Sequence, residues 1–193
     1  EVNSDERARS TEMPRYVTNS GYTEIQTTRS KVGGPSSYRN SLMIYDTEAD
    51  SIYSFRTDKI PGIRDLPGYV KDYPNRKNII PEERIVSVSG INWSEDGKFP
   101  VVNITSADNK DRWIMLLDLK TGIPESLDRQ RDEAWIGGPG TRNIGWMPDN
   151  ERIWFQSEES GYSHLYTLNV VTKEKKALTS GKFEVFGPRM SKD

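Results

Sequence analysis

The chain has 193 residues, of which 33% are hydrophobic and 10% aromatic, a composition typical of a globular protein with one sizeable core. Its 27 Lys and Arg residues nearly balance 29 Asp and Glu residues, which excludes the basic field needed for nucleic acid or an anionic membrane surface. With no cysteine and one histidine, thiolate chemistry and a multi-His metal centre are excluded within the chain. We therefore expect no cofactor, no metal, no nucleic-acid partner and no membrane span.

The N-terminal third predicts few strands. Residues 1–10, EVNSDERARS, lack the apolar centre of a signal peptide and suggest a piece of a longer protein. YTEIQTTRS at 22–30 is a candidate inner strand, and LMIYDTEADSIYSF at 42–55 is typical of two strands joined by a tight turn. Residues 57–84 then contain four prolines, too many for a central helix, and predict a long loop.

The rest of the chain repeats itself, and the repeat predicts the fold. INWSEDGK at 91–98 matches IGWMPDNE at 144–151, so that Trp93 and Trp146 occupy equivalent positions and should both be buried in blade cores. GPRMSKD at 187–193 begins a further copy. Each copy predicts four antiparallel strands, at 90–94, 100–105, 112–119 and 124–127, and again at 142–147, 152–157, 163–169 and 175–179.

Four-stranded units at such a period are typical of a β-propeller. We expect an all-β chain: a partial β-propeller of about three four-stranded blades plus the first strand of another. All of it would be one propeller domain with five parts: an N-terminal segment and partial blade at 1–60, a long inter-blade loop at 57–87, blades at 88–128 and 141–180, and the opening strand of the next blade at 183–193.

Strand alternation also predicts where a site would lie. In an up-and-down blade the second-to-third and fourth-to-first connections share one end, and here these are the long ones. Their segments are 57–84, 106–112, 128–142 and 157–163. Charged and aromatic side chains in them are the candidate substrate-binding residues: Arg112, Glu133, Trp135, Glu158, Glu159 and Tyr162. No catalytic residue is predicted.

The polar turn around Glu158 and Glu159 has two readings. Turn chemistry favours a solvated turn, while the paired carboxylates could instead bind a substrate amine. Ser160 and His164 lack a third partner and a Gly-x-Ser-x-Gly elbow, so we expect no nucleophile there. His164 is expected to pack at the start of its strand with the imidazole bonded to a backbone group.

Residues 153–185, IWFQSEESGYSHLYTLNVVTKEKKALTSGKFEV, resemble the dipeptidyl peptidase IV N-terminal propeller of the prolyl oligopeptidase family of serine peptidases. KVGGPSS at 31–37, SLMIYD at 41–46 and PGIRDLP at 61–67 are similar to bacterial members. The resemblance implies a propeller without catalysis of its own, joined in the parent protein to a C-terminal α/β-hydrolase domain with a Ser, Asp and His triad. It also implies a peptide substrate and a periplasmic or secreted location.

In that family a Glu-Glu pair and an arginine of the propeller bind the substrate's free N-terminus. Glu158 and Glu159 lie in a different sequence context, so the resemblance does not transfer this role to them. Two alternatives stay open. One is a free-standing, TolB-like propeller that binds a protein partner. The other is a glycan-binding propeller, for which Tyr69, Tyr73, Trp135 and Tyr162 would supply the aromatic surface.

Overall fold

The computed structural model describes residues 10–28, 41–73, 75 and 79–191. The chain divides into two compact units, Glu1–Arg39 and Asn40–Asp193. The KVGGPSS segment at 31–37 lies outside the described residues.

The first unit contains a β-hairpin of two short strands. Strand β1 (Thr11–Arg15) pairs with β2 (Glu24–Thr28) in antiparallel register, with Met13 opposite Gln26. Gly21, with a φ of 72°, lies in the turn, where a left-handed backbone is required. The expectation that 22–30 adds an inner strand to a blade was wrong, because its strand-forming residues pair locally with β1, a strand the sequence did not predict.

The second unit begins with another hairpin, β3 (Met43–Asp46) and β4 (Ser51–Ser54). Asp46 stabilises its turn by accepting hydrogen bonds from the backbone amides of Glu48 and Ala49 at 2.9 and 3.0 Å. The long segment that follows carries two 3-10 turns, η2 (Thr57–Lys59) and η3 (Gly68–Asp72), and no longer helix among its described residues.

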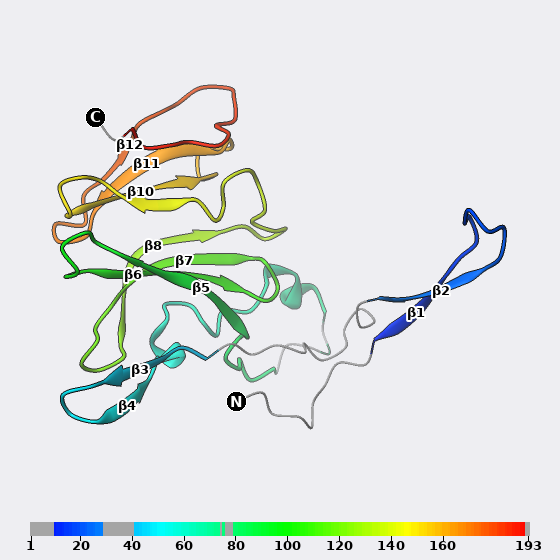
Figure 1. The fold of residues 1–193 in the computed structure, drawn as a ribbon, viewed down its shortest axis with the longest axis horizontal. Coiled ribbons are helices and arrows are strands. Elements are labelled where there is room, and N and C mark those ends of the chain that lie inside the picture. The colour runs from blue at the N-terminus through cyan, green and yellow to red at the C-terminus, as the bar shows by residue number, and fades with distance from the viewer. Residues whose placement is uncertain (1–9, 29–40, 74, 76–78, 192–193) are drawn as a thin grey trace. The chain divides into compact units, whose positions relative to one another are not determined.

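Two four-stranded antiparallel sheets form the body of this unit (Figure 1). The first consists of β5 (Val86–Trp93), β6 (Pro100–Ser106), β7 (Asp111–Leu117) and β8 (Pro124–Arg131), in chain order. The second consists of β9 (Ile144–Trp146), β10 (Arg152–Ser157), β11 (His164–Asn169) and β12 (Lys175–Ala177), also in chain order. Together with the β3–β4 hairpin they make a partial β-propeller, which confirms the predicted fold class.

The first sheet buries both faces of its central strands, as expected of a blade between neighbours. Along β6 and β7, alternate residues point to opposite faces. Val102, Ile104, Trp113 and Met115 join a core cluster with Phe55, Ile60 and Ile63 from the preceding segment. Val101 and Ile114 instead join a cluster with β10 and β11, built on Ile153, Phe155, Tyr166 and Leu168.

The two repeat tryptophans are not both buried. Trp146 is half-buried and stacks on Phe99 with ring centroids 6.2 Å apart, whereas Trp93 is 46% exposed. The expectation for Trp93 was therefore wrong. The fully buried indole is that of Trp113, whose Nε1 donates to the carbonyl oxygen of Pro61 at 2.9 Å.

The connections differ between the two ends of the sheets (Figure 1). Tight turns join β5 to β6, β7 to β8, β9 to β10 and β11 to β12 at one end. The other end, here called the loop end, holds residues 57–84, 107–110, 132–143 and 158–163, of which 57–84 and 132–143 are the long connections. Residues 181–191 contain no strand in the described part of the chain, where the sequence predicted the opening strand of a further blade.

Candidate functional site

Hydrogen bonds tie the long connections together at the loop end. The Ile136 amide donates to the Asn109 carbonyl oxygen at 2.7 Å, and the Gly68 amide donates to Glu133 Oε2 at 2.7 Å. Lys110 Nζ also donates to the carbonyl oxygen of Glu133. These contacts confirm that three of the four segments predicted to share one end of the propeller, 57–84, 106–112 and 128–142, lie together.

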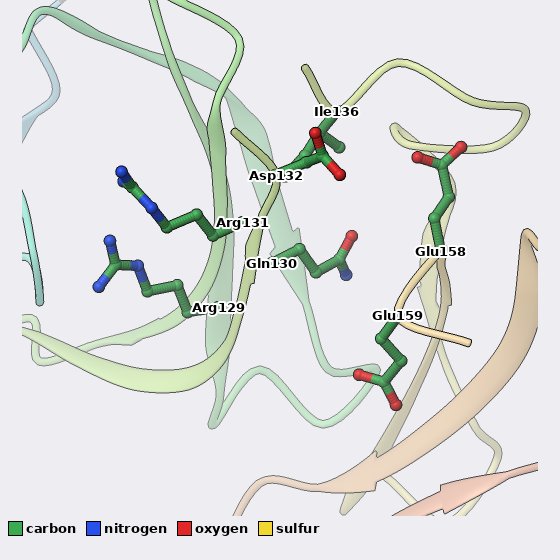
Figure 2. Close-up of a pocket in the computed structure, with 7 residues that line it drawn as sticks. All are labelled: Arg129, Gln130, Arg131, Asp132, Ile136, Glu158 and Glu159. Carbon is green, nitrogen blue, oxygen red and sulfur yellow. The ribbon is translucent and has the colours of Figure 1, made fainter. Parts of the chain in front are cut away.

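A pocket of about 380 Å³ opens at this end, between β8 and the β10–β11 turn (Figure 2). Successive side chains along β8 point alternately toward and away from the cavity. Figure 2 shows the guanidinium groups of Arg129 and Arg131 directed away from Glu158 and Glu159, while Gln130 and Asp132 extend toward the opposite side. The side chains that face the cavity are therefore mainly acidic. The complete lining is Arg129, Gln130, Arg131, Asp132, Ile136, Glu158 and Glu159.

Glu158 is the partly buried carboxylate of this pocket. Burial raises its pKa above the usual range of a glutamate, and the nearby charges of Glu184 and Asp132 raise the pKa further. Backbone amides of Gly137 and Gly138 donate hydrogen bonds to the carboxylate and partly offset these effects on the pKa. A Cβ at position 138 would overlap the Glu158 carboxylate, so any larger residue there would require Glu158 to shift from this position.

Glu159 is held by Lys175, which links the two blades. Lys175 Nζ pairs with Glu159 and also donates to Asp128 Oδ1 at 2.7 Å. It lies 4.9 Å from the ring centroid of Tyr166, within cation–π range. Burial alone would lower the pKa of Lys175, but its hydrogen bonds to the Asp128 and Glu159 carboxylates outweigh burial and raise the pKa.

Arg112 does not belong to the open surface. It lies in β7, not in the preceding turn, and is completely buried. Its guanidinium donates to Asn103 Oδ1 at 2.8 Å and to the Gln156 carbonyl oxygen at 2.7 Å, joining the two sheets. Burial lowers its pKa to about 10, an effect countered by the Asp128 charge, so that it stays cationic at neutral pH. Its expected role in substrate binding is corrected to one of joining the blades.

The remaining candidates lie at the loop end and differ in how far their side chains are anchored or exposed. Glu133 is anchored by the Gly68 amide, which is the main reason that its pKa falls, with Arg131 adding to the effect. Trp135 is 70% exposed and Tyr162 is 36% exposed, so both rings can meet a ligand. Tyr69 and Tyr73 pack edge to face, with centroids 6.2 Å apart.

His164 has the structural role expected from sequence. It is buried, and its ring nitrogens lie 3.0 Å from Thr179 Oγ1 and 3.0 Å from the Gly181 carbonyl oxygen. Phe183 packs on it edge to face. Ser160 Oγ bonds to the Tyr162 carbonyl oxygen at 3.3 Å, and no hydrogen bond joins it to His164 within the described part of the chain.

Sequence reasoning missed Asp132, Lys175 and the buried amide Gln156. Gln156 Nε2 donates to Ser163 Oγ at 3.0 Å and to the Val185 carbonyl oxygen at 2.7 Å, so it ties the pocket's turn to the C-terminal segment. Asp132 and Gln156 both fall within or beside predicted loop-end segments, and the alternation of β8 could have marked Asp132. The contact of Lys175 with β8 joins two blades, and no local sequence pattern predicts it.

Within residues 10–28, 41–73, 75 and 79–191, no group of three or more His, Cys, Asp and Glu side chains could hold a metal ion. Among the same residues, no helix has the length and apolar character to cross a membrane.

Comparison with known proteins gives the family. Residues 76–191, more than half of the chain, match the family described as Dipeptidyl peptidase IV (DPP IV) N-terminal region. No curated protein sequence matches the chain. Among solved structures, it is similar to the Porphyromonas gingivalis dipeptidyl peptidase 4, with a TM-score of 0.58 and 15% identity over 92% of this chain and 22% of that one.

A second similar structure is a Bacteroides ovatus ATCC 8483 protein assigned as a dipeptidyl aminopeptidase IV. Its TM-score is 0.54, with 16% identity over 90% of this chain and 24% of that one. At these identities the two structures support the fold alone, and the chain spans about a quarter of the length of either. The family match covers both four-stranded sheets and the pocket between them. The chain belongs to the dipeptidyl peptidase IV N-terminal region family.

Proposed function

We propose that this chain is the non-catalytic propeller part of a dipeptidyl peptidase IV-like serine peptidase, and that its loop end governs the access of peptides to the hydrolase site. The family match supports the parent activity, and the parent protein would carry a C-terminal α/β-hydrolase domain. No serine, histidine and acid of the described residues form a catalytic triad, so hydrolysis would depend on that other domain.

The observation that carries the proposal is the acidic pocket at the loop end. Its cavity-facing carboxylates, Asp132, Glu158 and Glu159, outnumber the one cation that forms an ion pair with them among the described residues, Lys175. Lys175 is itself shared with Asp128. The excess negative charge suits the protonated amino terminus of a peptide, and a partly buried carboxylate gains most from such a partner. We assign this contact to Glu158, with Glu159, Glu133, Trp135 and Tyr162 as the surrounding surface.

The test is Glu158→Gln in the full-length protein, with Glu174→Gln as a matched control in the β11–β12 turn at the opposite end. In the Glu158 variant, the KM for chromogenic dipeptides with a free amino terminus should rise at least about tenfold, because the carboxylate charge that binds the amino terminus is lost. A tenfold rise corresponds to about 1.4 kcal/mol of binding free energy. The same peptides with a blocked amino terminus should be affected equally little by both variants. An unchanged KM for the free peptides would refute the assignment.

A further inference from the structure

Asp111, on the opposite face of the first blade from the pocket, gathers three arginines. Its side chain is completely buried at the start of β7. Arg84 Nη1 and Arg131 Nη1 each lie 2.6 Å from Oδ2, and Arg129 Nε lies 2.8 Å from Oδ1. The β7–β8 register explains two of these contacts, because Arg131 is directly opposite Asp111 and Arg129 is opposite the next residue on the same face, Trp113.

Each arginine of this group also holds the long segment that precedes the blade. Arg84 donates to the carbonyl oxygens of Gly62 and Ile63 at 2.8 and 3.3 Å. Arg129 pairs with Asp65 at 2.6 Å. Arg131 Nη2 donates to the Leu66 carbonyl oxygen at 3.4 Å. The name arginine clasp is used below for Asp111 with Arg84, Arg129 and Arg131.

The clasp is electrostatically balanced by groups at its rim. One carboxylate cannot neutralise three guanidinium groups, and Asp65, Asp108 and Glu133 bring the total to four carboxylates for three guanidinium groups. Trp113 lies beneath it, with Arg84 and Arg129 at 5.4 and 5.8 Å from its ring. Asp111 is the only member of this charge cluster with no exposed side-chain surface, so its loss would leave the cations to repel one another.

The clasp also explains why the pocket is acidic. Arg129 and Arg131 line it, but their charged ends are directed away from Glu158 and Glu159 (Figure 2). Their guanidinium groups are bound to Asp111 instead. A continuous chain of contacts then runs from Arg131 to Glu133 at 2.8 Å and from Glu133 to the Gly68 amide at 2.7 Å.

We propose that Asp111 is a positioning residue for peptide access. It fixes residues 61–68 against the start of the β8–β9 connection and retains two arginines away from the acidic pocket. This inference rests on the proposed function of the loop end. Asp111 would touch no substrate, and its effect would pass through the segment and the arginines that it holds.

The test uses Asp111→Asn in the full-length protein, with Asp58→Asn as the control. Asp58 lies in the same long segment, and its ion pairs among the described residues are with the exposed side chains of Arg56 and Lys59. Amide hydrogen exchange in residues 61–68 should accelerate at least about tenfold in the Asp111 variant and stay unchanged in the control. The KM for peptides with a free amino terminus should rise several-fold, with kcat nearly unchanged. If Asp111→Asn does not fold, Arg84→Gln, which removes one of the three guanidinium groups, should give smaller changes in hydrogen exchange and KM in the same direction.

The two readouts separate the clasp from the proposed function. Unchanged exchange in residues 61–68 in a folded variant would overturn the clasp. Faster exchange with an unchanged KM would confirm that Asp111 holds the segment and would overturn its role in peptide access, while the proposed function of the loop end is tested separately by Glu158→Gln. A change in kcat alone would overturn the positioning role, because it would place the effect on the chemical step.

Discussion

The indole Nε1 of Trp146 donates a hydrogen bond to the backbone carbonyl oxygen of Asn92 over 3.1 Å. The bond links the first strand of one blade to the first strand of the blade before it, one residue from the equivalent tryptophan, Trp93. The same sequence position thus serves two different environments. Trp146 has a neighbouring blade to pack on, whereas Trp93 is 46% exposed in the described structure.

Truncating the two tryptophans should therefore have unequal effects on stability. Trp146→Ala loses the stacking on Phe99 and the bond to Asn92, and should lower the free energy of unfolding by about 3 kcal/mol. Trp93→Ala removes an exposed ring and should cost under about 1 kcal/mol. Urea unfolding followed by circular dichroism at the β-sheet band would measure both. Equal losses would show that Trp93 is covered in solution.

This inequality shows what the repeat could and could not predict. The bounds of β10 agree with the predicted strand at 152–157, because local alternation and the flanking turns define that strand. Burial of a given side chain depends instead on which segment covers its face. Trp113 is buried because residues 60–63 fold over it, a contact across about fifty residues that no local pattern encodes.

The same reason explains the candidate site. Turn chemistry and strand alternation were enough to predict that Glu158 and Glu159 lie at the end with the long connections. The predicted strand at 112–119 already contained Arg112, but local pattern could not predict that this side chain points into the blade interface, because the face depends on the pairing register and on the segment that covers it. Nor could it predict the partner of Glu159, because Lys175 reaches it from the far strand of the second blade.

Lys175 should contribute more to stability than its neighbour Lys173. Lys175→Met would leave Asp128, whose side chain is only 8% exposed, without its cation, and should cost about 3 kcal/mol. Lys173 pairs with Glu125, whose side chain is 59% exposed, so Lys173→Met should cost under about 1 kcal/mol. The difference in urea midpoint between the two variants measures the inter-blade pair. A difference of zero would mean that the blades are not coupled through Lys175.

Glu158 should make stability fall as pH rises through its titration. Its folded pKa is raised by burial and by Glu184 and Asp132, so the folded state binds the proton more tightly than the unfolded state does. The resulting stabilisation is full below the ordinary glutamate pKa and is lost as pH rises through the folded pKa. Carboxyl-carbon NMR shifts would locate this titration above the ordinary range. In Glu158→Gln the same fall in stability should disappear, and its persistence would assign the effect to another group.

The last prediction concerns two glycines with the same backbone conformation but different surroundings. Gly122 has a φ of 69° and Gly97 a φ of 73°, so alanine at either position incurs similar backbone strain, about 1 kcal/mol. A Cβ at Gly122 would lie 2.6 Å from the Ser54 carbonyl oxygen, whereas one at Gly97 would meet nothing within 4 Å. The Gly122 carbonyl oxygen also accepts a hydrogen bond from the Arg56 amide at 2.9 Å, which joins the β7–β8 turn to the end of β4.

Gly122→Ala should thus cost about 1 to 3 kcal/mol more than Gly97→Ala, the range for forcing extra volume into a packed site. Because the contacting atom belongs to the backbone, the strain cannot be relieved by a side-chain rotation. Parallel urea titrations of the two variants would give the difference directly, and equal midpoints would mean that the β3–β4 hairpin does not pack on this turn in solution.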